Sequence, residues 1–329
     1  MSLLIDRTEL TPSISCVMPA FNEAGTLARL VPQVLERLLR LSSRVELVIV
    51  NDGSRDASAQ VIDSLCRQHP EVVGLDLSRN FGKESALTAG LDATRGDVVV
   101  LMDADGQHPV ELVERMLGLW REGHDVVYAV RRTREDQSRL HAGLTSAFYR
   151  LINWGSRVEI PPHAGDFRLM DRQVVEALKA LPERNRFMKG LYNWVGFTQL
   201  PVETHTQDRR AGKSSFNFFS LLNLGLTGLT AFSNVPLRMW TLIGSSISFA
   251  SILYAVWEFL HTLLWGNDQP GWPTLAVAIF FLGGVQLLSV GILGEYIGRI
   301  FTEVKQRPAY FVSRITRSSS LLPKDGEQQ

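Results

Sequence analysis

Two hydrophobic patterns divide the chain. Up to about residue 203, polar and apolar positions alternate as in a soluble domain, and two long apolar stretches follow at residues 240–265 and 273–297. Each stretch is roughly 25 residues long, which is enough to cross the hydrocarbon core of a bilayer. Glu258 and His261 are the only acidic, basic or imidazole groups of the first stretch, and Glu295 is that of the second. The pattern therefore predicts two transmembrane helices within residues 236–299.

Short apolar runs alternate with helix-spaced segments in the first part of the chain, residues 1–210. The runs of strand length lie at residues 14–18, 45–50, 72–77, 98–102 and 126–130. Helical spacing is found at residues 26–39, 57–67 and 83–93, with Asp56 placed to cap the second of these helices and Pro109 placed to open a fourth. This alternation predicts an α/β domain with a mostly parallel sheet and helices on both faces.

Three of the predicted strands end in polar motifs. These are Pro19-Ala20-Phe21-Asn22-Glu23, Asn51-Asp52-Gly53-Ser54 and Asp103-Ala104-Asp105. The carboxyl ends of parallel strands lie along one edge of a sheet, which is where such folds bind ligands. Two carboxylates at the end of a buried strand suit Mg²⁺ or Mn²⁺ that carries a diphosphate. A plain surface turn would explain the aspartate motif alone, but three converging motifs favour a site.

Charge and composition exclude several classes of function. Lys and Arg total 34, as do Asp and Glu, so the formal net charge is zero and we expect no nucleic-acid partner. Cys16 and Cys66 have no metal-ligand spacing and imply no disulfide framework. The first strand is not followed by the glycine fingerprint of dinucleotide-binding folds, and the segment Gly212-Lys213-Ser214 lacks the first glycine of a phosphate loop. The N-terminal residues do not form a secretory signal peptide.

Positive charges flank the apolar stretches unevenly. Arg238 precedes the first stretch, residues 266–272 between the stretches contain no Lys or Arg, and five cations follow the second: Arg299, Lys305, Arg307, Arg314 and Arg317. Because cytoplasmic loops carry an excess of Lys and Arg, we predict that both termini lie in the cytoplasm. Residues 1–210 then form a cytosolic domain, and residues 300–329 form a cytosolic tail.

Residues 211–235 are rich in Phe and Leu and nearly uncharged over 214–233. They predict amphipathic helices at the membrane interface, with a helix packed on the soluble domain as the alternative. Within the spans, Glu258 and Glu295 indicate partners or an oligomer interface, because ionisable groups in a bilayer rarely face lipid.

The motifs together resemble a known family. PAFNE, VNDGS, DADGQ and GDFRLMDR, in this order and ahead of two apolar spans, resemble glycosyltransferase family 2, and in particular the polyprenyl-phosphate glycosyltransferases related to dolichol-phosphate mannose synthase. RNFGKESALTAGLD, PERNRFMKGLYNWVGF, PLRMWTLIG and LGEYIGRIFTEVKQRP are similar to bactoprenol glucosyltransferases of O-antigen modification systems. The resemblance runs over residues 14–314, and the combined order of the motifs is more specific than any one of them.

The resemblance implies a Rossmann-like GT-A fold and an inverting transfer of a hexose, with glucose expected. The implied donor is a UDP-sugar, the implied acceptor is undecaprenyl phosphate, and the implied cofactor is Mg²⁺ or Mn²⁺. It also implies a multi-pass protein of the bacterial inner membrane that assembles as a homo-oligomer, by family a tetramer.

The resemblance also assigns site residues. Those implied to bind substrate are Pro19, Ala20, Asn22, Glu23, Asp52, Lys83, Asp103, Ala104, Arg131, Arg209 and Lys213. Asp105 and Gln107 are the implied metal ligands, and the implied catalytic set is Asp103, Asp105, Asp166 and Arg209. Asp166 is expected near the sugar and the acceptor phosphate, or paired with Arg168. In the family, the glycine that corresponds to Gly212 is often followed by an acidic residue, then Ser or Thr, then Lys. In this chain the lysine, Lys213, follows the glycine directly and so stands two places earlier.

A phosphate monoester acceptor is mostly dianionic at pH 7, so it attacks without a general base, and the protein's task is to position it. Two other functions remain open. A processive polysaccharide synthase of the same superfamily would need more spans and a Gln-x-x-Arg-Trp motif, and the sequence has neither. A membrane-tethered nucleotide-sugar sensor without catalysis would not need the intact aspartate motif, Gln107 and the basic residues.

Overall fold

The structure is a computed structural model that describes residues 7, 11–131, 164–184, 186–204, 235–265 and 271–318. The chain forms two compact units. The first comprises residues 1–146, 159–216 and 308–329, and the second comprises residues 147–158 and 217–307. The predicted interfacial segment, Arg209 and Lys213 lie outside the described residues, as does the side chain of Arg131.

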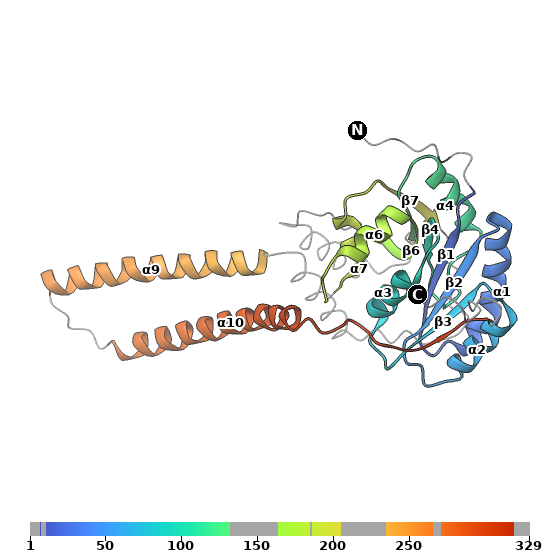
Figure 1. Ribbon diagram of the computed structural model, residues 1–329. Helices are drawn as coiled ribbons and strands as arrows, with labels where there is room; N and C mark the ends of the chain where they lie inside the picture. The colour runs from blue at the N-terminus through green and yellow to red at the C-terminus, as the bar shows by residue number, and fades with distance from the viewer. Residues whose placement is uncertain are drawn as a thin grey trace, which may run out of the picture. The chain divides into compact units, whose positions relative to one another are not determined.

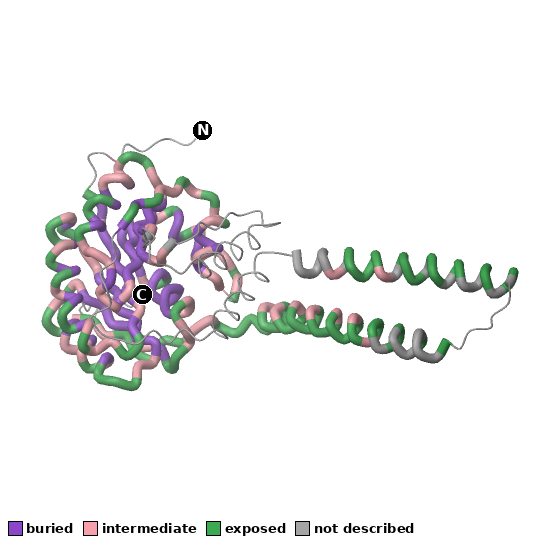
Figure 2. Tube along the Cα trace, turned by 180° about the vertical axis from the view of Figure 1, so that it is seen from behind, coloured by how far each residue is buried: buried purple, intermediate pink, exposed green. Residues whose placement is uncertain are grey.

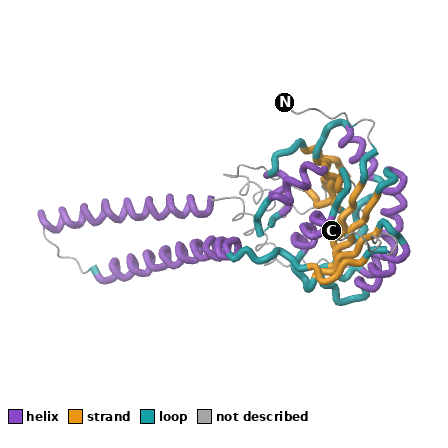
Figure 3. Tube along the Cα trace, viewed as in Figure 1, coloured by secondary structure: helices purple, strands orange, loops and turns teal. Residues whose placement is uncertain are grey.

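The first unit is built on one sheet of eight strands, which Figure 3 shows as a single layer. The strands are β1 Ile14–Ala20, β2 Val45–Asn51, β3 Val72–Leu77, β4 Val98–Leu101, β5 Val126–Arg131, β6 Ala164–Asp171, β7 Gln199–Thr204 and β8 Val312–Thr316. Their order across the sheet is β7-β5-β6-β4-β1-β2-β3-β8. The predicted α/β class is confirmed, and β1, β2 and β4, whose ends carry the polar motifs, are parallel neighbours.

Two strands run against the parallel strands that they join. β6 pairs antiparallel with both β4 and β5, and β8 pairs antiparallel with β3. The sequence pattern predicted neither strand. β8 lies within residues 300–329, which were expected to form only a tail, and it closes the edge of the sheet beside β3 (Figure 1).

Helices cover both faces of this sheet, as predicted. The helices are α1 Ala24–Leu41, α2 Ser58–Gln68, α3 Lys83–Ala93, α4 Leu112–Arg121, α6 Arg172–Ala180 and α7 Met188–Trp194. Figure 1 shows α1 and α2 on one side of the sheet and α3, α6 and α7 on the other. Burial drives this arrangement, because six apolar positions of α1 recur at helical spacing and are buried, namely Leu27, Leu30, Val31, Val34, Leu35 and Leu38. The buried residues form a continuous interior in Figure 2.

Two helix starts differ in detail from the prediction. α4 begins at Leu112 rather than at Pro109, because Pro109 opens a turn whose carbonyl accepts a hydrogen bond from the Leu112 amide at 3.1 Å. α2 begins at Ser58, and the Asp56 carboxylate accepts the Ser58 amide at 3.0 Å, so Asp56 does bond to the first residue of this helix.

The second unit contains two long helices, α9 Val235–Trp265 and α10 Trp272–Val304. The indole of Trp240 on α9 donates a hydrogen bond to the Ser289 hydroxyl on α10, so the helices pack as a hairpin. Among the described residues, one segment is long and apolar enough to cross a membrane, Phe281–Val304 with a mean hydropathy of 1.4. α9 contributes the shorter apolar segment Leu242–Ser251, and the second span stays a prediction.

Candidate active site

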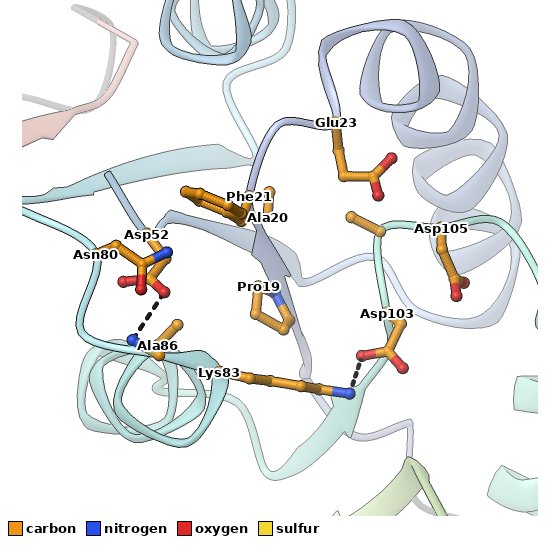
Figure 4. Close-up of a pocket in the computed structure, with 12 residues that line it drawn as sticks. Pro19, Ala20, Phe21, Glu23, Asp52, Asn80, Lys83, Ala86, Asp103 and Asp105 are labelled. Carbon is orange, nitrogen blue, oxygen red and sulfur yellow. Dashed lines mark hydrogen bonds and ion pairs between the residues drawn. The ribbon is translucent and has the colours of Figure 1, made fainter. Parts of the chain in front are cut away.

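A cavity of about 330 Å³ opens at the carboxyl edge of the sheet, a volume within the range of small-molecule sites. It lies at the ends of β1, β2 and β4 and at the start of α3 (Figure 4). Its lining residues are Pro19, Ala20, Phe21, Glu23, Asp52, Asn80, Gly82, Lys83, Ala86, Asp103, Ala104 and Asp105. The three polar strand ends therefore meet in one place, as the sequence predicted.

Asp52 joins two loops at one end of the cavity. Its carboxylate accepts the amide of Phe81 at 2.7 Å and that of Gly82 at 2.9 Å, which ties the end of β2 to the loop that precedes α3. Burial raises the pKa of Asp52, while these two hydrogen bonds and Arg79 act in the opposite direction. The same two loops touch at Gly53, where an added Cβ would lie 2.5 Å from the backbone of Arg79. Only glycine allows this close approach, and its φ of +64° also favours glycine.

Lys83 joins two carboxylates at the other end of the cavity. Its Nζ lies 2.7 Å from Asp103 Oδ1 and 2.7 Å from Asp166 Oδ2. Asp166 reaches this place because β6 runs antiparallel to β4, so that the beginning of β6 lies beside the end of β4, with Leu101 opposite Arg168. Burial opposes the charges of Lys83 and Asp166, but the neighbouring charges and hydrogen bonds together outweigh it: Asp166 and Asp103 raise the pKa of Lys83, and Lys83 with Lys189 and Arg168 lowers that of Asp166.

Behind this cluster, α7 packs against the start of α3. Glu84 Oε2 accepts the amide of Met188 at 3.1 Å, and burial together with the neighbouring Asp166 raises the pKa of Glu84 to about 7. The guanidinium of Arg168 stacks on Tyr192 with its Cζ 3.4 Å from the ring centroid, and it donates to the carbonyl of Gly165 at 2.7 Å. The Asp166 carboxylate forms its ion pair with Lys83, and Arg168 bonds to main-chain carbonyls, so the alternative pairing of the two side chains is not the one formed.

The aspartate motif fits a divalent cation in its chemistry. Asp103 and Asp105 both line the cavity. Asp105 Oδ1 accepts a hydrogen bond from the amide of Gln107 at 3.0 Å, which orders the turn at residues 105–107. Within the described ranges, no three His, Cys, Asp or Glu side chains gather as a complete metal cage. Mg²⁺ and Mn²⁺ are commonly held by one or two carboxylates together with substrate phosphates, so this donor set fits them. Gln107 is buried and does not line the cavity, so its role as a ligand stays a prediction.

Most of the predicted site residues meet in this cavity: Pro19, Ala20, Glu23, Asp52, Lys83, Asp103, Ala104 and Asp105. Asn22 does not line it. Its φ is +58°, its amide donates to the Ser54 hydroxyl at 3.0 Å, and its side chain accepts the Arg55 amide at 2.8 Å, so it connects two loops. Arg131 is the last residue of β5.

Sequence reasoning assigned no role to four of the lining residues: Phe21, Asn80, Gly82 and Ala86. A signal for two of them was present. The third predicted strand also ends in polar residues, Ser78-Arg79-Asn80, and the strand-end argument applied to the other three strands extends to Asn80 and Gly82. Phe21 and Ala86 carry no polar group that the argument could use.

Aspartates at the carboxyl edge of an α/β sheet, beside a cavity of this size, define a small-molecule site, and the family whose model matches the chain gives the class of the protein, a glycosyltransferase with the GT-A fold. The model of "Glycosyl transferase family 2" matches residues 15–179, and that of the "GtrB C-terminal hairpin" matches residues 235–300. The chain belongs to glycosyltransferase family 2 and is an enzyme of that family.

The similarity to known proteins extends over nearly the whole chain. It is 46% identical over 306 residues to the SfII prophage-derived bactoprenol glucosyl transferase of Shigella flexneri, with 93% of this chain and 99% of the relative covered. It is 45% identical over 304 residues to an uncharacterised glycosyltransferase of Synechocystis sp., with 92% and 96% covered. Among solved structures, it is similar to mannosyl-3-phosphoglycerate synthase of Rubrobacter xylanophilus at 20% identity and a TM-score of 0.45, with 74% of this chain and 78% of that chain covered.

Proposed function

We propose that this enzyme transfers a hexose, with glucose the expected sugar, from a UDP-sugar to a polyprenyl phosphate, and inverts the anomeric centre. The observation that carries the proposal is the cavity in which Asp52, Asp103 and Asp105 meet the Lys83–Asp166 pair. The relatives that are named bactoprenol glucosyl transferases support the choice of acceptor and of glucose.

The donor occupies the cavity with its nucleoside towards Asp52 and its diphosphate towards Asp105. Asp105 would hold Mg²⁺ or Mn²⁺, with Gln107 as the second expected ligand and Asp103 facing the ribose and the ion. The ion supplies positive charge that stabilises the departing diphosphate. Lys83 lines the cavity and adds a second positive charge at its far end, where Asp103 and Asp166 fix the direction of the ammonium group.

The acceptor phosphate is its own nucleophile. One of its oxygens forms a bond to the anomeric carbon while the bond between this carbon and the diphosphate breaks, and the electron pair leaves with UDP. No proton has to be removed from a phosphate dianion, so Asp166, which Lys83 keeps ionised, orients groups rather than acting as a base. Arg131, Arg209 and Lys213 are the cations that we expect to bind the phosphates.

The hairpin of α9 and α10 supports the proposal that this chemistry takes place at a membrane. We propose that both helices span the bacterial inner membrane and that the first unit lies on the cytoplasmic side, because Arg238 stands in the first turn of α9 and further cations stand near the end of α10 and after it. Residues 211–235 would lie at the interface and present the lipid phosphate. A homo-oligomer, in the family's manner a tetramer, would shield Glu258 and Glu295 from lipid.

Incubation of the purified full chain with UDP-glucose, Mn²⁺ and undecaprenyl phosphate tests the proposal. We expect a single lipid-linked hexose, detected by mass spectrometry and by its release under mild acid, and its inverted configuration is read from the NMR coupling constant of the anomeric proton. An elongating polymer would instead identify a processive synthase, and donor binding without turnover would identify a sensor. A panel of UDP- and GDP-sugars under the same conditions then identifies the sugar.

A further inference from the structure

β8 is an edge strand that burial alone does not hold in place. It pairs with β3, with Asp76 opposite Arg314 and Leu75 opposite Ile315. Its apolar side chains remain largely in solvent, since Ile315 is 57% exposed and Val312 is 38% exposed. The strand therefore adds little to the hydrophobic core, and we look to its polar contacts for what fixes its position.

Arg314 makes the most specific of these contacts. Its Nε and Nη2 reach the same oxygen, Asp76 Oδ2, at 2.8 and 2.7 Å, and its Nη1 reaches Asp63 Oδ2 at 2.9 Å. The Thr316 hydroxyl also donates to Asp63, at 3.1 Å. A planar guanidinium held by two carboxylates fixes direction as well as position. Because the arginine is half exposed, these ion pairs contribute little to global stability.

From Asp76, hydrogen bonds continue to the loops beside the cavity. The Asn51 side chain donates to Asp76 Oδ1 at 2.7 Å and accepts the Ser54 amide at 3.0 Å. The Ser54 hydroxyl in turn accepts the Asn22 amide at 3.0 Å. Arg314 therefore acts through Asp76 on the turn that carries Asp52.

A second connection reaches the loop before α3. The Ser78 amide donates to the carbonyl of Phe311 at 2.9 Å, and the rings of Phe81 and Phe311 lie 6.4 Å apart. The Tyr310 hydroxyl donates to Asp92 on α3 at 2.6 Å. This loop supplies Asn80 and Gly82 to the cavity and two amides to Asp52, so β8 and the two residues before it contact both loops of the nucleoside end.

We propose that β8 is a positioning element for the donor nucleotide, with Arg314 as its principal positioning residue. It orders the turn at residues 51–54 and the loop at residues 78–82, so that they are set before the nucleotide binds. Since residues 305–311 join α10 directly to β8, the element that shapes the donor site is the one through which the chain returns from the hairpin. The inference rests on the proposed function in one respect, that this cavity binds a nucleotide.

The experiment compares full-length Arg314→Ala with the wild type and with Arg317→Ala, which removes an exposed positive charge just beyond the strand. Calorimetry with UDP and Mn²⁺ should show a Kd about tenfold higher for Arg314→Ala and an unchanged Kd for Arg317→Ala. The KM for UDP-sugar should rise by the same factor, while kcat and the KM for the lipid acceptor stay constant. Arg314→Lys keeps the positive charge but not the planar guanidinium with its several donors, so it should restore the Kd only in part.

Hydrogen exchange without nucleotide separates this inference from the proposed function. In Arg314→Ala, the amides of Ser54, Phe81 and Gly82 should exchange faster, while those of β1 and β4 keep their protection. Absence of UDP binding by the wild type would overturn the proposed donor, and the exchange result would still decide whether β8 orders the loops. Unchanged exchange at these amides, or an unchanged Kd for UDP in a wild type that binds it, would overturn the inference.

Discussion

The proposed metal site depends most directly on Asp105, which lines the cavity and follows the buried strand β4. We expect Asp105→Ala to reduce kcat with UDP-sugar by about 100-fold or more, since the diphosphate charge loses its counterion. Rates measured across a titration of Mn²⁺ check this. Glu122→Ala, at an exposed carboxylate after α4, is the control. A near-native rate with the same metal requirement would contradict the assignment of Asp105.

The carboxyl group of Glu84 has a pKa that the fold raises to about 7. Burial and Asp166 raise its pKa from 4.5 to about 7, so the folded chain holds this proton more tightly than the unfolded chain does. The resulting stabilisation is fully present below the unfolded pKa of about 4.5 and is lost as the pH rises to about 7, where the buried group must ionise.

Glu84→Gln removes the charge and retains an oxygen that can accept the Met188 amide. We expect the variant to be close to the wild type at pH 5 and to exceed it at pH 8 by about 2–3 kcal/mol, which corresponds to a Tm increase of several degrees. Thermal unfolding from pH 5 to 8 measures this, with Glu122→Gln as the control. A difference in Tm that is independent of pH would show that the charge of Glu84 is not the cause.

The helix α3 owes its place to a close approach to the sheet. Gly90 lies so near β1 that an added Cβ would stand 2.2 Å from Val17 Cγ1 and 3.2 Å from Val50 Cγ2. The approach matters for the site because the same helix begins at Lys83, so displacement of the helix also displaces the ammonium group.

Gly90→Ala should therefore destabilise the fold by about 1–3 kcal/mol, although alanine is the better helix former. Gly118 on α4 is the matched control, since an added Cβ there meets nothing within 4 Å. Gly118→Ala should stabilise by up to about 1 kcal/mol. Denaturant unfolding of both variants tests the pair, and equal effects of the two substitutions would contradict the packing of α3 on β1.

The orientation of the whole chain in a membrane can be tested with cysteine labelling, because Cys16 and Cys66 are both buried. Gly271 lies between α9 and α10, is exposed, and has a φ of −82° that any residue adopts, so Gly271→Cys should be tolerated. We expect an impermeant maleimide to label Gly271→Cys on intact spheroplasts and Arg317→Cys only after permeabilisation. Labelling of both positions, or of Arg317→Cys alone, would rule out the proposed two-span topology.

Local patterns were sufficient to predict much of this enzyme. Hydrophobic periodicity predicted β1 to β5, the first helices and the α/β class, because it reports which face of each element must be buried. The strand ends predicted a site at this edge of the sheet, because parallel strands end at one edge, and the resemblance to the family implied eight of the residues that line it, Lys83 among them. The motifs predicted the family, which the similarity of the whole chain to its relatives confirmed.

Tertiary structure alone decided which elements are neighbours. Asp166 reaches Lys83, which also pairs with Asp103, because β6 inserts antiparallel beside β4, and Arg314 meets Asp76 because the chain returns after the hairpin to pair with β3. A strand's own pattern of polar and apolar residues predicts that it pairs. The pattern does not predict the partner strand or the direction of pairing, since every backbone offers the same donors and acceptors. The partners are selected by burial and packing of the whole sheet, and these long-range choices turned separate motifs into one site.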